Sequence, residues 1–231
     1  MQTVTSTGRL SSNNPNLQNI PIRTSKGKEI RRSFIARNED FQLMAADYSQ
    51  IELRIIAALS QDPTMIDAFK QGVDIHTATA SKVFHVALED VTKDQRSAAK
   101  AVNFGIIYGQ SAFGLSQTLN IPRGEAKAII DSYFEQYATI KSFMDQLVNN
   151  AREVGYVETI MNRRRYLPDI NSGNAIVRGY AERNAVNAPI QGPAADIIKL
   201  AMIAVDKAMS TQQLHSKLLL QVHDELVFDV H

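Results

Sequence analysis

Residues 43–59, LMAADYSQIELRIIAAL, decide the fold expected for this chain. The stretch opens with a short apolar run and continues with apolar residues at helical spacing, Leu53, Ile56 and Ala57. This pattern predicts a buried strand over Gln42–Ala46 and a helix over about 50–60. Asp47 then lies where the strand ends. It either caps the helix or, because burying an unpaired carboxylate is unfavourable, binds a cation.

The bulk composition describes a globular protein. The chain has 231 residues, of which 44% are apolar and 21% charged, and a net charge of +1 that favours no particular partner. It has no cysteine, which excludes disulfides, thiolate catalysis and zinc–sulfur sites. The polar N-terminus lacks a signal-peptide core, and the apolar stretch Ile197–Val205 is too short to span a bilayer. We therefore expect a soluble cytoplasmic protein without membrane contact.

Turn residues and apolar periods divide the rest of the chain into short elements. Strands are expected over 3–7 and 29–36, and a β-hairpin over 155–170 with its tip near 161–163. Helices are expected from Pro63 to Gly72, from a cap at Asp74, and over 111–119, 122–136 and 141–154. A further helical pattern over 177–209 is expected to be interrupted at Pro189 and at Gly192-Pro193.

The stretch KDQRSAAKAVNFGIIYGQ, residues 93–110, predicts a helix of about four turns whose inner face carries Ala99, Val102 and Ile106. On its other face four residues recur every fourth position, Arg96, Lys100, Phe104 and Tyr108. Two cations alone would indicate a solvated face, but two rings continue the stripe. The stripe is about 18 Å long and suits a nucleoside triphosphate, with phosphates on the cations and a base against the rings. Gly105 weakens the helix, which suggests a close approach to its backbone.

Three polar stretches leave two interpretations open. Residues 3–24, with Arg9, and the basic cluster at 163–165 suit either phosphate contacts or ordinary solvated surface. Arg183, Asn187 and Gln191 step by four along one polar face, which suits minor-groove acceptors and also water. A lone histidine such as His76 is more often structural than a ligand.

The chain ends in KLLLQVHDELVFDV, residues 217–230, which predicts a strand, a tight turn and a strand. Asp224 in a turn needs no special explanation. However, apolar residues flank it on both sides, as they do Asp47. Two rigidly held carboxylates at neighbouring strand ends are also what a hard divalent cation requires.

At this point the sequence resembles the family A DNA polymerases. DYSQIELR at 47–54, RSAAKAVNFGIIYG at 96–109 and QVHDE at 221–225 resemble the family's first acidic motif, its nucleotide-binding helix and its second acidic motif. Shorter matches follow the family's order along the whole chain, namely TGRLSS at 7–12, PNLQNIP at 15–21, DIHTATA at 74–80 and NAPIQGPAADIIK at 187–199.

The resemblance implies an α+β fold. An antiparallel sheet in a palm subdomain, 1–66 and 183–231, would carry the catalytic acids, and a mostly helical fingers subdomain would occupy 67–182. In the family, a helical thumb and a proofreading-type domain would precede the equivalent of Gln2, and more palm would follow His231. The resemblance further implies a monomer that binds primer–template DNA and deoxynucleoside triphosphates.

It also implies roles for individual residues. Two Mg²⁺ ions would be held by Asp47, Asp224 and the Tyr48 carbonyl, with Glu225 in support. The incoming triphosphate would meet Arg96, Lys100, His76, Phe104 and Gln50, and Lys100 would donate a proton to the leaving group. Glu52 and Tyr108 would close over the sugar and exclude a 2′-hydroxyl. DNA would be contacted by Arg9, Arg183, Asn187 and Gln191.

The implied function is template-directed transfer of deoxynucleotides to a primer 3′-hydroxyl. One alternative is a fragment that binds nucleotide or DNA without significant turnover, because the thumb and the end of the palm are missing. A weaker alternative is a two-metal nuclease, since paired acids also suit hydrolysis.

Overall fold

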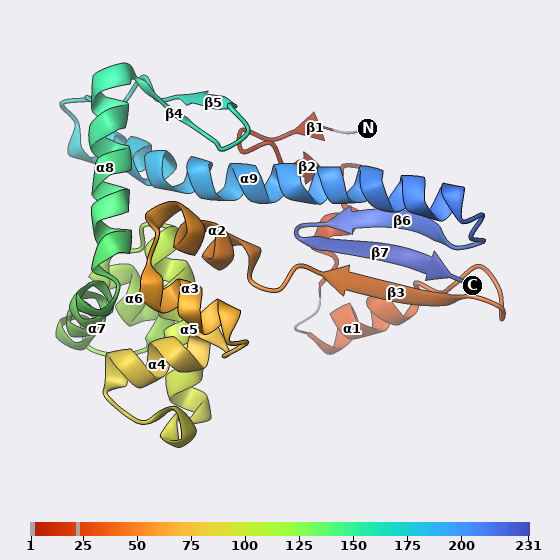
Figure 1. Cartoon of the computed structure of the whole chain (residues 1–231), viewed down its shortest axis with the longest axis horizontal. Helices are drawn as coiled ribbons and strands as arrows, with labels where there is room; N and C mark the ends of the chain where they lie inside the picture. Colours follow the sequence, from red (N-terminus) through yellow and green to blue (C-terminus); the bar gives the residue numbers. More distant parts are fainter. Residues whose placement is uncertain (1–2, 22–23) are drawn as a thin grey trace. The chain divides into compact units, whose positions relative to one another are not determined.

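The computed structural model describes residues 3–21 and 24–231, and its fold is α+β (Figure 1). The chain forms two compact units. The first comprises the chain up to Ile51 together with Gln191–His231, and the second is Glu52–Ile190. The expected subdomain bounds, 1–66, 67–182 and 183–231, share this discontinuous arrangement but remain a prediction. Compactness instead divides the chain at 51/52 and 190/191.

The first unit contains the three-stranded sheet. Its elements are β1 (Thr3–Val4), β2 (Leu10–Ser11), a 3₁₀ turn (Leu17–Asn19), α1 (Ser25–Arg32), β3 (Gln42–Asp47), the later part of α9 (Ala175–Thr211), β6 (Lys217–Val222) and β7 (Glu225–Val230). The three long strands are antiparallel in the order β3-β7-β6, with β7 in the centre (Figure 1). The expected terminal hairpin is therefore confirmed.

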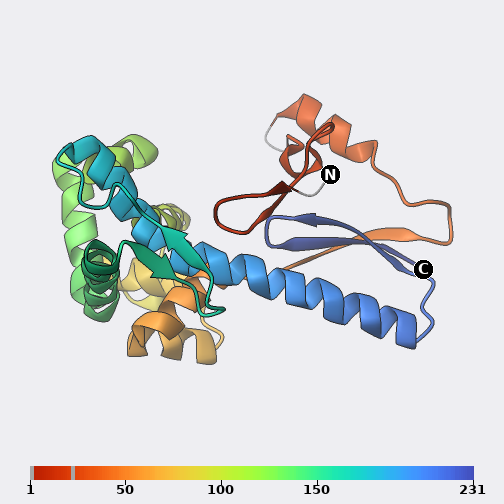
Figure 2. The same cartoon turned by 90° about the horizontal axis from the view of Figure 1, so that it is seen from above.

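The later part of α9 covers the β6–β7 pair (Figure 2). Ile198 on the helix packs with Leu226 and Phe228 on β7, and all three are at most 6% exposed. Partly buried Met202 and Val205 extend this cluster. This core holds the turn between β6 and β7 on a rigid base.

The expectation that strand Gln42–Ala46 is buried was wrong. The strand exists, as β3, but all six of its residues are exposed. β3 lies at the edge of the sheet and pairs only with β7 among the described residues. An apolar run resembles a buried strand, but burial needs a covering layer, and the Ile198 cluster lies against β6 and β7 instead.

The strand expected over 29–36 was also wrong, because Ser25–Arg32 forms helix α1. The Thr24 side chain accepts a hydrogen bond from the Gly27 N–H at 3.1 Å and so caps the first turn. The apolar residues that suggested a strand entering the core, Phe34 and Ile35, follow the helix and are 43% and 79% exposed.

The expected break near Pro189 and Gly192-Pro193 is absent, since α9 runs unbroken from Ala175 to Thr211. An interior proline removes one hydrogen bond and costs about 3 kcal/mol. Buried packing on both sides of the prolines offsets that cost, with Ala185, Ile190, Ala194 and Ile198 all at most 3% exposed.

By length and composition α9 is also apolar enough to cross a membrane, a test that core helices of soluble proteins pass as well. In this structure 44% of its apolar window is buried inside the protein. Packing inside the protein therefore accounts for part of the apolar character of α9.

The second unit is helical. Its elements are α2 (Ile51–Ser60), α3 (Pro63–Lys70), α4 (Ile75–Phe84), a 3₁₀ turn (Leu88–Asp90), α5 (Lys93–Ile107), α6 (Ala112–Leu119), α7 (Arg123–Gln136), α8 (Ala138–Val154), the hairpin β4 (Tyr156–Glu158) and β5 (Arg164–Tyr166), and the start of α9. The expected helices and hairpin are confirmed. Pro122, expected as the first helical residue, instead precedes α7 as its cap.

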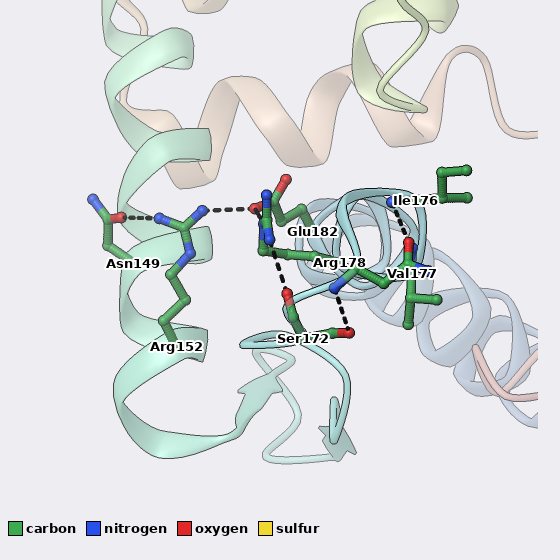
Figure 3. A network of polar contacts seen from close by, with 8 residues as sticks. Asn149, Arg152, Ser172, Ile176, Val177, Arg178 and Glu182 are labelled. Carbon is green, nitrogen blue, oxygen red and sulfur yellow. Dashed lines mark hydrogen bonds and ion pairs between the residues drawn. The ribbon is translucent and has the colours of Figure 1, made fainter.

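Polar contacts join α8 to the start of α9 (Figure 3). Arg152 on α8 donates to Glu182 on α9 at 2.6 Å, and Arg178 lies 3.8 Å from the same carboxylate oxygen. Arg178 also donates to the Ser172 carbonyl at 2.8 Å. These contacts border an apolar cluster that includes Ala151 and Ala185. They attach the start of α9 to α8 and to the segment that precedes it.

One stability prediction follows from Asp62, which is 2% exposed, caps α3 through the Met65 N–H at 2.9 Å and accepts a hydrogen bond from Thr139. We expect Asp62→Ala to lower the free energy of unfolding by about 2 kcal/mol, because a cap and a buried partner are lost together. The control Asp67→Ala, at an exposed position of the same helix, should change it by less than about 0.5 kcal/mol. Urea unfolding followed by circular dichroism measures both, and equal losses would contradict this account.

Candidate functional site

Three carboxylates meet at one end of the sheet. Asp47, the last residue of β3, stands directly opposite Glu225, the first residue of β7. Asp224 occupies the turn before β7, and its carbonyl accepts a hydrogen bond from the Tyr48 N–H at 3.1 Å. The β-ladder therefore brings together residues from the two ends of the chain, as predicted.

The electrostatics of this cluster are unfavourable by themselves. Burial, and then the charge of Asp224, raise the pKa of Asp47 above its ordinary value of 3.8. Directly opposed carboxylates such as Asp47 and Glu225 also repel each other across strands. Arg9 offsets part of this charge, since its guanidinium lies 3.9 Å from an Asp224 oxygen. A bound cation would offset more.

The carboxylates open onto a cavity of about 560 Å³ that also includes Gln18, Asn19, Arg31 and His223. Sequence patterns predict no role for these four residues. Gln18 and Asn19 belong to the PNLQNIP motif, which was the available signal. Gln18 donates to the Gln221 carbonyl at 3.1 Å and is thereby fixed beside the turn. No sequence signal indicates Arg31, which lies in the segment expected to be a strand.

The oxygen atoms of this cluster are ligands that suit a hard divalent cation. Asp47 and Asp224 supply carboxylate oxygens, and the next residue after Asp47, Tyr48, has a main-chain carbonyl of the same ligand type. No group of three or more His, Asp or Glu side chains is placed to hold a metal within residues 3–21 and 24–231. This set would leave coordination positions for ligand oxygens, which is how Mg²⁺ is commonly bound beside phosphates.

In the helical unit, α5 presents the predicted stripe. Arg96 and Lys100 are exposed, Tyr108 is 37% exposed, and Phe104 is partly buried. The opposite side packs inward as expected, with Ala99, Val102 and Ile106 at most 4% exposed. A capping box between Thr92 and Gln95 begins the helix, and Tyr108 ends it.

Gly105 lies against a side chain of the same unit. A Cβ there would collide with the Gln110 side chain, which folds back over the helix. Arg183 similarly lies over Gly109, whose φ is +67°. These residues line a second cavity of about 620 Å³, together with Phe104 and Tyr108. At these two glycines, side chains of the same unit pack on the backbone of α5 and of the turn that follows it.

Asp74 and Arg96 form an ion pair at one end of this stripe. Asp74 caps α4 through the Thr77 N–H at 2.8 Å, and Arg96 donates to it at 3.0 and 2.9 Å. Burial by itself would raise the pKa of Asp74, but hydrogen bonds from Arg96 and Thr77 lower it to about 2. Two residues along, His76 is 3% exposed and bonded to Asn103 at 3.0 Å.

Glu52 is bonded to Tyr108 within the helical unit. It is 3% exposed and accepts a hydrogen bond from the Tyr108 hydroxyl at 2.6 Å. Gln50, just before α2, has a φ of 57°, which is uncommon for a residue other than glycine. The turn after β3 is therefore a constrained one.

The remaining expected residues lie along α9. Because the helix is unbroken, Arg183, Asn187 and Gln191 keep their four-residue spacing without interruption. Arg183 is exposed, whereas Asn187 and Gln191 are partly buried. The Asn187 Oδ1 atom is buried and has no hydrogen-bond partner among the described residues. An acceptor left in this state suits a ligand that brings a donor.

Repulsion at the carboxylate cluster generates a prediction. Because the pKa of Asp47 is raised in the folded state, its stabilising effect is present at low pH and is lost as pH rises through that pKa. Removing the neighbouring charge with Asp224→Asn should therefore lower the pKa of Asp47. Without divalent cations at pH 7 it should change the free energy of unfolding by less than about 0.5 kcal/mol, because relief of repulsion and loss of the Arg9 ion pair have opposite signs.

Carboxyl NMR titration and urea unfolding measure these two effects. The exposed control Asp206→Asn, on α9, should change neither. A destabilised Asp224→Asn protein with an unchanged pKa of Asp47 would contradict the proposed repulsion.

Comparison with known proteins places these features in a family. Residues 1–231 match the model of DNA polymerase family A. The chain is 56% identical over 231 residues to DNA polymerase I of Lactococcus lactis subsp. cremoris and 54% identical over 228 residues to that of Geobacillus stearothermophilus, and it covers 26% of the length of each.

Among solved structures, the polymerase domain of Pol1 from M. smegmatis in complex with DNA primer-template and dNTP is similar to this chain, with a TM-score of 0.93 and 51% identity. The match covers 99% of this chain and 40% of that one. The chain thus spans about a quarter of the length of its curated relatives. It belongs to DNA polymerase family A.

Proposed function

We propose that this chain is the catalytic core of a DNA-directed DNA polymerase, which transfers deoxynucleotides from dNTPs to a primer 3′-hydroxyl on a DNA template. The observation that carries the proposal is the register that sets Asp47 opposite Glu225 and beside Asp224, over an open cavity. The M. smegmatis relative, which is bound to primer-template and dNTP, supports both partners.

Asp47, Asp224 and the Tyr48 carbonyl would hold two Mg²⁺ ions, with Glu225 in support. Bound there, the ions would supply activation of the primer hydroxyl and stabilisation of the triphosphate. The carboxylate oxygens, and the burial and repulsion that raise the pKa of Asp47, fit this group. The protein's own contribution is to hold these carboxylates at fixed spacing on the β-ladder.

The exposed stripe of α5 would bind the incoming nucleotide. Lys100 and the donors of Arg96 left by its ion pair would meet the phosphates, and Lys100 would give a proton to the leaving pyrophosphate. Gln50 and His76 would complete the nucleotide site. Phe104 would pack against the sugar.

Glu52 and Tyr108 would set sugar selectivity. Their 2.6 Å hydrogen bond joins a buried carboxylate to an exposed ring at the end of α5. The pair would fill the space beside C2′ and exclude a ribonucleotide hydroxyl.

DNA would be held along α9 and at the β1–β2 turn. Arg9, Arg183, Asn187 and Gln191 would contact the primer–template duplex through its backbone and minor groove. The Asn187 Oδ1, unpartnered among the described residues, could accept only from the guanine amino group, because the other minor-groove atoms and the phosphates are acceptors. We further propose that the chain acts as a monomer, in the cytoplasm and without membrane contact.

Primer extension tests the proposal directly. With Mg²⁺, dNTPs and excess primer–template, the 231-residue chain should extend the primer. Asp224→Ala should slow extension at least about a hundredfold, because a metal ligand is worth several kcal/mol to the transition state. The control Asp206→Ala should retain activity. If the unsubstituted chain binds dNTP and DNA without extending the primer, it is a binding fragment. Degradation of DNA without dNTPs would instead indicate a nuclease.

Sugar selectivity provides a second test. Glu52→Ala opens space beside Tyr108 and should raise ribonucleotide incorporation, relative to deoxynucleotide, by about tenfold or more, the effect of about 1.4 kcal/mol. Glu52→Gln keeps the volume and an acceptor oxygen for the tyrosine, so it should change the ratio little. Competition between labelled ribo- and deoxynucleotides measures the ratio independently of the folded fraction. An unchanged ratio in both variants would remove Glu52 from the sugar site.

A further inference from the structure

A chain of polar side chains runs through the apolar interior behind the α5 stripe. Thr79, Asn103 and Tyr137 are 0% exposed, and His76 is 3% exposed. The Asn103 amide nitrogen lies 3.0 Å from His76 Nδ1 and 3.1 Å from Thr79 Oγ1, and the Thr79 oxygen lies 3.2 Å from the Tyr137 hydroxyl. Apolar residues of the same volume could pack α4 against α5 equally well. What polar groups add is directional hydrogen bonding, and here it is directed at the His76 imidazole.

The donor and acceptor types decide the state of the ring. An amide nitrogen can only donate, so the His76 Nδ1 atom that faces it must accept. A neutral imidazole with an accepting Nδ1 carries its proton on Nε2. With Nδ1 occupied, Nε2–H is the one polar group that the ring can offer to a ligand.

Burial is the main reason that the ring is neutral. Burial lowers the pKa of His76 below its ordinary value of 6.5, and Arg96 and Lys100 lower it further, against the opposing charge of Asp74. The Phe104 ring packs at 5.8 Å between centroids. At neutral pH the imidazole is therefore an uncharged donor beside two cations.

We propose that Asn103 is a positioning residue that fixes His76 as the Nε2–H tautomer, and so makes it a one-way hydrogen-bond donor to a phosphate oxygen of the bound nucleoside triphosphate. The ligand half of this inference rests on the proposed function. Asn103 itself does not touch the nucleotide. It acts through the ring, and the tautomer it selects excludes an acceptor atom that would repel phosphate oxygens.

Thr79 and Tyr137 extend the hydrogen-bond network behind the amide. The Thr79 hydroxyl lies within 3.2 Å of the Asn103 carbonyl oxygen as well as 3.1 Å from its nitrogen. Burial raises the pKa of the Tyr137 hydroxyl to about 12, so it stays protonated and able to donate to Thr79. The amide is thus held between His76 and the Thr79 hydroxyl, with its nitrogen toward Nδ1.

Nitrogen NMR of the histidine rings tests the tautomer without reference to activity. The His76 signals are assigned by their loss in His76→Gln. In the unsubstituted chain at pH 7.5 we expect a neutral ring with the proton on Nε2. Asn103→Asp replaces the donor by an acceptor and should move the proton to Nδ1. Thr79→Val should produce a tautomer mixture, whereas Thr79→Ser, which keeps the hydroxyl, should not.

A His76 that carries its proton on Nδ1 in the unsubstituted chain overturns the proposal. So does a tautomer that is indifferent to both Asn103→Asp and Thr79→Val. Because the first measurement needs no substitution at Asn103, a variant that fails to fold does not rescue the proposal.

Binding of dATP, with deoxyadenosine as the control ligand, tests the phosphate contact. Once its proton is on Nδ1, the ring of Asn103→Asp can donate from Nε2 only when charged. We therefore compare the dATP affinity of Asn103→Asp with that of the unsubstituted chain at each pH. This ratio should fall about tenfold from pH 6 to pH 8, which is the effect of losing one hydrogen bond to a charged group. Deoxyadenosine affinity should not follow this pattern.

A pH-independent affinity ratio in a variant whose tautomer has switched would refute the phosphate contact. If the unsubstituted chain binds no dATP at all, the proposed nucleotide site fails, and the NMR result then decides the role of Asn103 separately.

Discussion

The register between β3 and β7 is the constraint on which the candidate active site depends. It sets Asp47 opposite Glu225 and draws the turn at Asp224 against Tyr48 through a main-chain hydrogen bond. A shift of one residue would move Asp47 to the other face of the sheet. The resulting carboxylate cluster opposes folding, and main-chain pairing together with the Ile198 cluster offsets that repulsion. This repulsion is one reason for the cation proposed at this site.

In the helical unit, hydrogen bonds in the core hold the side chains of the proposed nucleotide site. This unit must present cations and rings on one face of α5 while keeping that helix in place. The inner face is apolar, but behind it Asn103, Thr79 and Tyr137 place a polar chain in the core. Polar groups in such a position constrain direction, which apolar packing does not. The imidazole of His76 is thereby oriented from inside the protein, and Arg96 is oriented by Asp74 at the surface.

Local signals predicted much of this structure. Asp62-Pro63, Asp74 and Gly155 mark helix ends that the structure contains, because caps act over one turn of chain. The turn at His223-Asp224 was recognised between two apolar runs. Errors arose where distant packing decides. The exposure of β3 depends on which side of the sheet α9 covers, and the continuity of α9 depends on buried contacts on both sides of its prolines. The α1 error was local, since the Thr24 cap was overlooked.

The sequence by itself determined the motifs, their order and hence the family, along with the stripe on α5, because helical spacing follows from a residue count. The pairing of Asp47 with Glu225, the bond between Tyr108 and Glu52, and the buried contact of Asn103 with His76 were decided only by the tertiary structure. Each joins residues far apart in the chain, and nothing in local spacing encodes which of the many possible partners a side chain meets once the helices and strands have packed.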